Sequence, residues 1–266
     1  DAVYVATPTS VREEICLAAA NAGKHVLGEK PFFSLASVQR IAAACRKNGV
    51  GFMDGTHFVH HPRTLQIQAR TDELTGQPWS VASAFQFGLS NTNNIRLRPD
   101  LEPMGAIGDA GWYNMKAIAT YLPQWYAGEV EISRIQTFAN REPVNNAVNR
   151  AAGVIEFSDG STSTWNCSFE SGSMVQDCRI SGRDGVISLD DFIVHRSATE
   201  PASYDLKSGR EVSSIEVPAD RPAAAQMFED MSLMVGNSEA FEASVQTTER
   251  TQALLDAVWG AANTSS

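Results

Sequence analysis

The first quarter of the chain alternates short apolar runs with longer segments whose apolar residues recur at helical spacing. Short apolar runs are typical of buried strands, and the longer segments are typical of amphipathic helices. Ser34 stands where a helix N-cap is expected, and Gly23 and Gly49 follow the two helices, where a left-handed residue is favoured. The predicted order is strand, helix, strand, helix, strand, over residues 3–6, 11–22, 25–27, 35–46 and 50–53. Because strands separated by helices connect through right-handed crossovers, this region predicts part of a parallel, doubly wound domain.

Beyond residue 63 the pattern changes to a meander. A long strand is predicted over residues 80–89, and helices are predicted over residues 63–72, 109–122, 223–235 and 245–259. Six consecutive strand-like segments lie between them, at residues 131–139, 152–157, 161–170, 174–181, 186–189 and 193–196, with turn signals at residues 159–160 and 183–185. Consecutive strands predict an antiparallel sheet with helices on one face. The fold class is therefore α/β, with part of a doubly wound domain followed by an α+β domain that has a large, mainly antiparallel open sheet.

The composition is that of a globular protein and argues against two classes of partner. With 266 residues, 43% of them hydrophobic, the chain can bury a sizeable core. A net charge of −10 opposes binding to nucleic acid or to an anionic membrane surface. No apolar run approaches the roughly 20 residues that a membrane helix needs. We therefore expect neither a nucleic-acid partner nor a membrane partner.

The four cysteines show neither a CxxC pair nor a Cys/His spacing typical of a metal site. Two of them, Cys16 and Cys45, fall on apolar faces of predicted helices. We expect all four to be buried free thiols, which suit a reducing compartment, and the cytoplasm is the default location.

Lys30 lies at the carboxyl end of a predicted strand, within the tripeptide Glu29-Lys30-Pro31. Open α/β sheets bind their ligands at the carboxyl ends of strands. Pro31 fixes the turn and removes a backbone donor, so the lysine side chain is held at the strand end. A positioned ammonium group there can hold a substrate hydroxyl and stabilise the alkoxide as hydride leaves. The tripeptide alone also fits an exposed lysine on a turn.

A second group of candidate residues consists of Asp109, Trp112, Tyr113 and Lys116. Spacings of three and four residues place them at neighbouring positions of a helix. The carboxylate and the phenol can then reach one ligand, and Tyr113 can take a hydroxyl proton if Lys30 lowers its pKa from the usual ~10. The alternative is that Asp109 caps the helix and Tyr113 is a half-buried aromatic residue.

Two further groups carry weaker signals. His57, His60 and His61 have no carboxylate or cysteine at ligand spacing, so we expect cleft-lining or helix-capping roles and no metal site. Arg96 and Arg98 lie in a loop, where they clamp an anionic or hydroxyl-rich ligand or are surface charges. No GxGxxG loop occurs in the chain. Gly49 and Gly51 resemble part of one, but they precede a predicted strand, whereas the glycine loop must follow one.

Two motifs together resemble the Gfo/Idh/MocA family, the relatives of glucose-fructose oxidoreductase and inositol dehydrogenase. They are Ala6-Thr7-Pro8 with GKHVLGEKP at residues 23–31, and the Gly-Asp-x-Gly helix start at residues 108–111. The resemblance runs over nearly the whole chain. Residues 60–63 and 105–113 look most like the branch that contains xylose and trans-dihydrodiol dehydrogenases.

The resemblance implies two domains. Residues 1–60 correspond to the C-terminal part of a Rossmann domain that binds NAD or NADP, and residues 61–266 to an α+β domain for substrate binding and oligomerisation. The front half of the Rossmann domain, with its glycine loop, has no counterpart in this sequence, so we expect an N-terminally truncated chain whose strand at residues 3–5 has an exposed edge.

The resemblance also implies positions for the cofactor. Thr7 and Pro8 are expected to lie along it, Glu29 and Lys30 near the nicotinamide and its ribose, and Pro31 is expected to shape the turn.

The same comparison implies roles at the second motif. Tyr113 stands where many members carry a catalytic histidine, and tyrosine is the variant of the dihydrodiol and sugar dehydrogenase branch. Lys116 stands where many inositol-type members carry an acid, which argues against an inositol dehydrogenase.

The expected function is NAD(P)-dependent transfer of hydride between nicotinamide and a carbinol carbon of a sugar or cyclic diol, by a homo-oligomer. Lys30 would polarise the oxygen, Tyr113 would act as acid and base, and Asp109 would orient the pair. The residues expected to contact substrate are Arg96, Arg98 and Trp112. Two alternatives remain, a non-catalytic sensor that binds a dinucleotide and a protein partner, and a truncated chain that is itself inactive.

Overall fold

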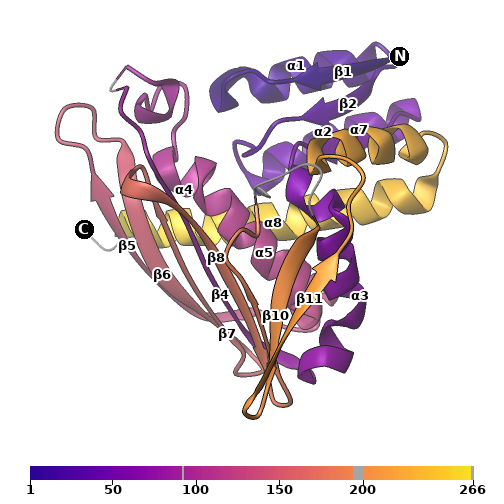
Figure 1. Ribbon diagram of the computed structural model, residues 1–266. Helices are drawn as coiled ribbons and strands as arrows, with labels where there is room; N and C mark the ends of the chain where they lie inside the picture. The colour runs from indigo at the N-terminus through magenta and orange to yellow at the C-terminus, as the bar shows by residue number, and fades with distance from the viewer. Residues whose placement is uncertain (92, 194–200, 265–266) are drawn as a thin grey trace.

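The first elements of the chain form a three-stranded parallel sheet, β1-β2-β3 (indigo in Figure 1), in a computed structural model that describes residues 1–91, 93–193 and 201–264. The elements are β1 (Ala2–Val5), α1 (Thr9–Asn21), β2 (His25–Gly28), α2 (Leu35–Asn48) and β3 (Phe52–Asp54). Both pairings, β1 with β2 and β2 with β3, are parallel as predicted. Within the described part of the chain β1 pairs with β2 alone, so its other edge is free.

The predicted capping residues of α2 are confirmed, although the helix runs two residues further than predicted. Ser34 Oγ accepts a hydrogen bond from Ser37 N (3.2 Å), which satisfies one of the free N–H groups at the helix start. Gly49 follows the helix with a φ of 64°, a conformation in which a β-carbon is strained.

Replacement of Ser34 by alanine is expected to lower the free energy of unfolding by about 1 kcal/mol, because the N–H of Ser37 loses its acceptor. Urea denaturation of the two proteins measures this. Ser213→Ala, on an exposed strand position, is the matched control and should change stability by less than about 0.5 kcal/mol. An equal effect of both substitutions would contradict the capping role.

The helix predicted over residues 109–122 is wrong as a single element. The structure has three helices there, α4 (Gly105–Asp109), α5 (Gly111–Tyr121) and α6 (Pro123–Ala127). Asp109 ends α4 and does not cap α5, whose N-cap residue is Ala110. Pro123 has no backbone N–H to continue the ladder of α5, so a new helix starts there. The elements before α4 are η1 (His57–His60), α3 (Pro62–Thr75), β4 (Pro78–Gly88) and η2 (Ile95–Leu97).

The second sheet has the strand order β11-β10-β9-β8-β4-β7-β6-β5 among the described residues. Its further strands are β5 (Ile132–Arg141), β6 (Val148–Phe157), β7 (Thr162–Ser168), β8 (Glu170–Gly182), β9 (Val186–Leu189), β10 (Ala202–Ser208) and β11 (Glu211–Val217). Every neighbouring pair is antiparallel except β4 and β7, which are parallel. The predicted large, mainly antiparallel sheet is therefore confirmed.

The end of this sheet differs from the prediction. The hairpin of β10 and β11 was not predicted, because most of its side chains are polar and only one face is apolar, through residues such as Tyr204 and Val217. Of the strand predicted at residues 193–196, Ile193 lies in a bend rather than a strand, and residues 194–196 lie outside the described residues.

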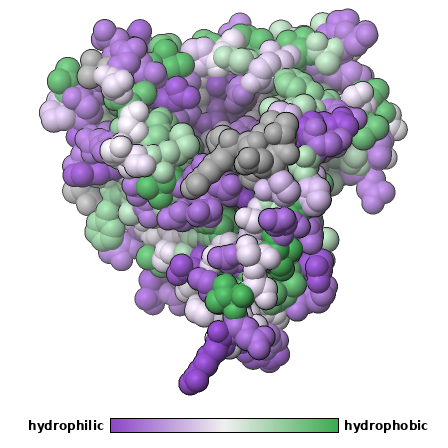
Figure 2. All heavy atoms as spheres, in the orientation of Figure 1, coloured by the Kyte–Doolittle hydropathy of each residue, from purple (hydrophilic) through white to green (hydrophobic). Residues whose placement is uncertain are grey.

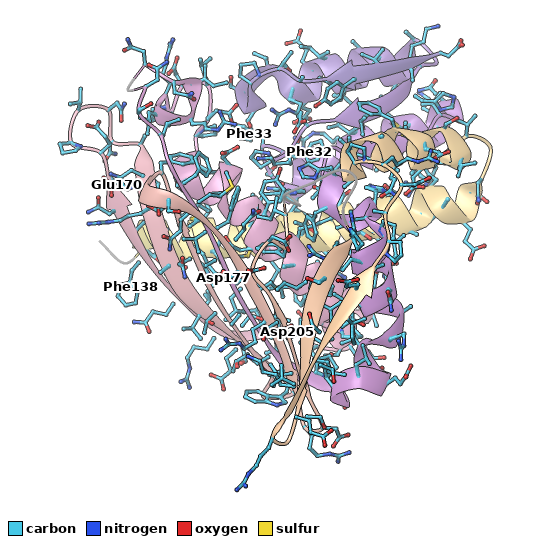
Figure 3. The ribbon with its side chains drawn as sticks, viewed as in Figure 1. Phe32, Phe33, Phe138, Glu170, Asp177 and Asp205 are labelled. Carbon is cyan, nitrogen blue, oxygen red and sulfur yellow. The ribbon has the colours of Figure 1, made fainter. Side chains whose placement is uncertain are left out.

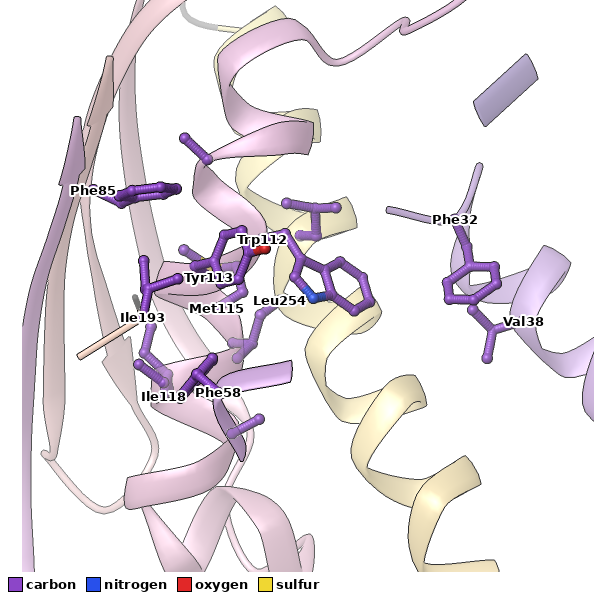
Figure 4. Packing of buried hydrophobic residues seen from close by; sticks show 14 of the residues in the cluster. Phe32, Val38, Phe58, Phe85, Trp112, Tyr113, Met115, Ile118, Ile193 and Leu254 are labelled. Atoms are coloured by element: carbon purple, nitrogen blue, oxygen red, sulfur yellow. The ribbon is translucent and has the colours of Figure 1, made fainter. Parts of the chain in front are cut away.

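Helix α8 lies between the two sheets (yellow in Figure 1) and contacts β3, α2, α5 and β5. The last two helices are α7 (Ala223–Met234) and α8 (Ser238–Thr264). Leu254, Leu255 and Val258 of α8 are fully buried. Figure 4 shows Leu254 beside Met115 of α5, so that α8 joins the cores of both sheets.

The face of the large sheet away from these helices is open. Phe138, Asp177 and Asp205, labelled in Figure 3, mark this face on β5, β8 and β10, and Phe138 is 64% exposed. Figure 2 shows hydrophilic and hydrophobic residues interspersed over the side of the molecule that it presents.

The four cysteines are free and buried, as predicted. Burial raises the pKa of each thiol to about 12, which makes the thiols poor nucleophiles. Among the described residues, no helix has the length and apolar character needed to cross a membrane.

Candidate active site

The turn that carries Lys30 lies at the carboxyl end of β2 and is anchored on both sides. Glu29 N donates to Val5 O of β1 (2.9 Å), and Phe32 N donates to Gln252 Oε1 of α8 (3.1 Å). Phe32 and Gln252 are both buried. The backbone on either side of Lys30 is therefore held by the neighbouring strand and by the C-terminal helix.

The Lys30 side chain reaches the two residues that were predicted with it. Its Nζ donates to Asp109 Oδ1 (2.7 Å) and to Asp109 O (3.0 Å), and it lies 4.7 Å from the centre of the Tyr113 ring. The side chain is only 9% exposed, so the alternative of an exposed lysine on a turn is wrong. The structure thus brings together Lys30, Asp109 and Tyr113.

Asp109 is shared by two cations. Its second oxygen, Oδ2, accepts from Arg96 Nε (2.7 Å) while Oδ1 is bound to Lys30. Gly108 allows α4 to come this close to the turn, because a β-carbon at that position would lie 3.2 Å from Pro31 Cγ. Asp109 therefore links the turn after β2 to the loop that carries Arg96.

The charges of the cluster stabilise one another. Burial alone would raise the pKa of Asp109, but Lys30 and Arg96 together hold the pKa of this carboxyl below its usual value. Burial alone would lower the pKa of Lys30, but Asp109, with Tyr113 and Glu29, raises the pKa of the amine above its usual value. At neutral pH Asp109 is therefore a carboxylate and Lys30 an ammonium ion.

Tyr113 differs from the prediction in its protonation. Burial raises the pKa of its hydroxyl, and although Lys30 acts in the opposite direction, as predicted, the net pKa lies above the usual value. Its ring packs against Phe85 (5.2 Å between ring centres) and Phe58 (6.2 Å), both labelled in Figure 4, and against His57 (6.1 Å), and the residue is buried. Without a further charge in the site, Tyr113 is a neutral phenol at physiological pH.

The three predicted substrate contacts fall in different places. Arg96 lies in the cluster with its side chain 40% exposed. Arg98 forms a surface ion pair with Asp100 (2.7 Å). Trp112 is fully buried and its Nε1 donates to Thr56 Oγ1 (2.7 Å), so its predicted contact with substrate is not supported.

The residues expected along the cofactor lie at the ends of β1 and β2. Thr7 Oγ1 is buried and has no hydrogen-bond partner among the described residues. Glu29 accepts a hydrogen bond from the Tyr4 hydroxyl on β1. A buried hydroxyl without a partner, beside a strand end and close to a charged lysine turn, fits one end of a polar cofactor.

Comparison with known proteins agrees with this geometry. Residues 1–56 match the model of the Gfo/Idh/MocA oxidoreductase family with its NAD-binding Rossmann fold. A D-xylose 1-dehydrogenase (NADP(+)) of Haloferax volcanii is 30% identical over 83% of this chain and 66% of the relative. The chain belongs to the Gfo/Idh/MocA family.

Two further comparisons concern one organism, Actinomadura kijaniata. Its dTDP-3,4-didehydro-2,6-dideoxy-alpha-D-glucose 3-reductase is 35% identical over 46% of this Gfo/Idh/MocA chain and 37% of the relative. A 3-ketoreductase from the same organism, solved with NADP and TDP-benzene, superposes with a TM-score of 0.85 at 23% identity, over 97% of this chain and 77% of that one. This chain thus spans less than two thirds of the length of the curated relatives named here.

The sequence did not predict the ion-pair partner of Lys116. Lys116 Nζ donates to Asp54 Oδ2 (2.6 Å), and the same oxygen accepts from Thr248 Oγ1 of α8 (2.7 Å). Lys116 and Asp54 are almost completely buried. Their polar side chains at otherwise apolar positions were the signal for a buried pair, but 62 residues separate them, so the sequence did not identify the partner. Both line a pocket of about 420 Å³ that does not contain Lys30 or Tyr113.

Of the three histidines, His61 caps a helix and His60 lines the same pocket as Lys116. His61 caps α3 by accepting from Arg63 N (3.1 Å), and His60 Nδ1 lies 2.6 Å from Asp230 Oδ2. In the described part of the chain, no group of three or more His, Cys, Asp and Glu side chains could hold a metal ion.

Proposed function

We propose that the protein containing this chain is an NAD(P)-dependent oxidoreductase that transfers hydride between nicotinamide and a carbinol carbon of a sugar or related polyhydroxy compound. The observation that carries the proposal is the buried cluster of Lys30, Asp109 and Tyr113 at the carboxyl end of the parallel sheet. The relatives named above act, by their names, on xylose or on a dTDP-linked deoxyketosugar, which supports a sugar-type substrate.

In this proposal the nicotinamide end of NAD or NADP is held by the turns at the ends of β1 and β2. The residues would be Thr7, Pro8, Glu29, Lys30 and Pro31, with Thr7 Oγ1 supplying a buried hydroxyl that lacks a partner among the described residues. When bound, the nicotinamide supplies or accepts the hydride.

The side chains of the cluster would manage the proton and the developing charge. Lys30 donates a hydrogen bond to the reacting oxygen and stabilises its negative charge, since Asp109 keeps the amine charged and oriented. Burial raises the Tyr113 pKa and keeps its phenol neutral, so it can give its proton to the oxygen when a carbonyl is reduced; the tyrosinate that this leaves takes the hydroxyl proton when the reaction runs in the opposite direction. Arg96 can donate to a substrate hydroxyl from its Nη groups, which form no hydrogen bond with the described residues, at the exposed side of Asp109.

Replacement of Tyr113 by phenylalanine tests the acid/base role. In the full-length protein kcat is expected to fall by about 10²–10³ while KM for both substrates changes only severalfold, because the ring packing is kept and only the proton donor is lost. Initial rates of NAD(P) reduction against aldoses, inositols and cyclic diols measure it, with Tyr126→Phe as the control. Unchanged turnover in Tyr113→Phe would exclude this role. Tight dinucleotide binding by the wild type without turnover on any substrate would instead favour a sensor.

The proposal extends to assembly and location. We propose a homo-oligomer and a cytoplasmic enzyme. The open face of the large sheet, where Phe138 is exposed, supports the first, and the four buried free thiols support the second.

A further inference from the structure

Arg12, near the start of α1, is a buried cation that the proposed chemistry does not use. Arg12 is only 4% exposed. Among the described residues no carboxylate forms an ion pair with its guanidinium group, and its Nε has no hydrogen-bond partner. A charge buried in this way is costly, so its hydrogen bonds must offset the loss of water.

The guanidinium group joins the two turns that face the proposed cofactor. Nη2 donates to Thr7 O (2.5 Å), in the turn after β1, and Nη1 donates to Pro31 O, directly after Lys30. Nη1 also donates to Thr9 Oγ1 (3.0 Å). The planar fork of arginine can hold two carbonyl oxygens in fixed positions at once, which a lysine ammonium on a flexible stem cannot do as well.

Thr9 extends these contacts to the connection between β4 and α4. Its backbone N donates to Glu102 Oε1 (3.0 Å), and its hydroxyl donates to Glu102 Oε2 (2.5 Å). Glu102 lies in the same connection that carries Arg96, between β4 and α4. The proximity of Glu102 also opposes the lowering of the Arg12 pKa by burial.

We propose that Arg12 is a positioning residue, which fixes the turns after β1 and β2 in one arrangement and so keeps Lys30 aimed at the reacting oxygen. This inference rests on the proposed oxidoreductase function for its catalytic consequence. Its structural part, the immobilisation of Lys30, can be measured without any turnover.

The first measurement is therefore the rate at which an amine reagent modifies Lys30, followed by mass spectrometry in the full-length protein. Lys30 is shielded in the wild type, and Arg12→Ala should expose it and raise its rate of modification about tenfold. Lys24, which is exposed, serves as the internal reference. Arg40→Ala is the matched control, since Arg40 also binds α1, through Glu13, but at the surface. Equal modification of Lys30 in wild type and Arg12→Ala would overturn the proposal.

The second measurement is catalytic and includes a rescue. Arg12→Ala should lower kcat about a hundredfold with little change in the KM of the sugar, and guanidinium ion at tens of millimolar should restore about tenfold. Guanidinium would only worsen a general loss of stability. A loss of kcat that guanidinium does not relieve, or no loss at all, would overturn the proposal.

A conservative variant covers the case in which Arg12→Ala does not fold. Arg12→Lys keeps the charge but not the fork, so it should lower kcat about tenfold and raise Lys30 modification; wild-type values for both would overturn the inference. If the wild type itself reduces no dinucleotide with any sugar, the proposed function has failed. The modification rates still decide the role of Arg12.

Discussion

Lys30→Met is expected to lower kcat of the full-length protein by about a thousandfold. Methionine has a similar length and packs in the same space. The turn that carries residue 30 should therefore keep its hydrogen bonds to Val5 O and to Gln252 Oε1 and stay in place. What is lost is the ammonium donor to the reacting oxygen, and Asp109 keeps Arg96 as its one remaining cation. The variant should therefore bind dinucleotide with nearly normal affinity and fail in the hydride step.

Stopped-flow and steady-state rates, with dinucleotide binding by fluorescence titration, measure the two effects separately. Lys24→Met is the control, because Lys24 lies six residues earlier at an exposed position and should keep wild-type turnover. If Lys30→Met kept more than about a tenth of wild-type kcat, the lysine would not act on the reacting oxygen. Another group would then have to stabilise the negative charge on that oxygen.

Lys116→Met should be the most destabilising substitution considered, at about 3–5 kcal/mol near pH 7. It leaves Asp54 buried with hydrogen bonds from Thr56 N and Thr248 but without its cation. Urea or thermal denaturation measures the loss. Arg46→Met, which breaks a surface pair with Glu242, should cost less than about 1 kcal/mol.

The pH dependence of this effect has a defined sign. In the wild type Lys116 holds the pKa of Asp54 below its usual value, against the effect of burial. The pair therefore stabilises the fold above the unfolded pKa of about 3.9, and this stabilisation is lost as the pH falls through the lowered folded value. In Lys116→Met burial raises the Asp54 pKa without Lys116 to oppose it, so the deficit should begin to shrink above about pH 4, as Asp54 is protonated in the folded variant, and should shrink further as the pH falls through the lowered wild-type value.

Asp54→Asn combined with Lys116→Met should recover part of the stability, since no unpaired charge is then buried. A double variant less stable than Lys116→Met would show that the pair is not the cause.

The sequence predicted those parts of the fold and site that are encoded locally. Lys30 lies just beyond the end of β2, where the sequence placed it, and Asp109 and Tyr113 are helical as predicted, although they belong to two helices, α4 and α5, rather than to one. Their meeting was inferred from chemistry and is seen in the ion pair of Lys30 with Asp109.

The parts that failed depend on distant residues or on burial. The Tyr113 pKa is raised by burial among aromatic rings such as that of Phe85. These rings come from other elements, so the burial is set by tertiary packing. The partners of Lys116 and Arg12 likewise come from other elements. Trp112 shares a helix turn with Tyr113 but points into the core between the two sheets, which a single helical face did not predict (Figure 4).

The anchoring of the Lys30 turn by α8 also sets an order for the maturation of the protein. Gln252 accepts from Phe32 N, and Asp256 accepts from Leu35 N, so residues of the last helix hold a turn made more than two hundred residues earlier. A ribosome adds roughly 5–20 residues per second, so the lysine turn waits many seconds for these acceptors. The N-terminal sheet can form while translation continues, but the site acquires its final geometry only once the C-terminal helix has been synthesised and docked.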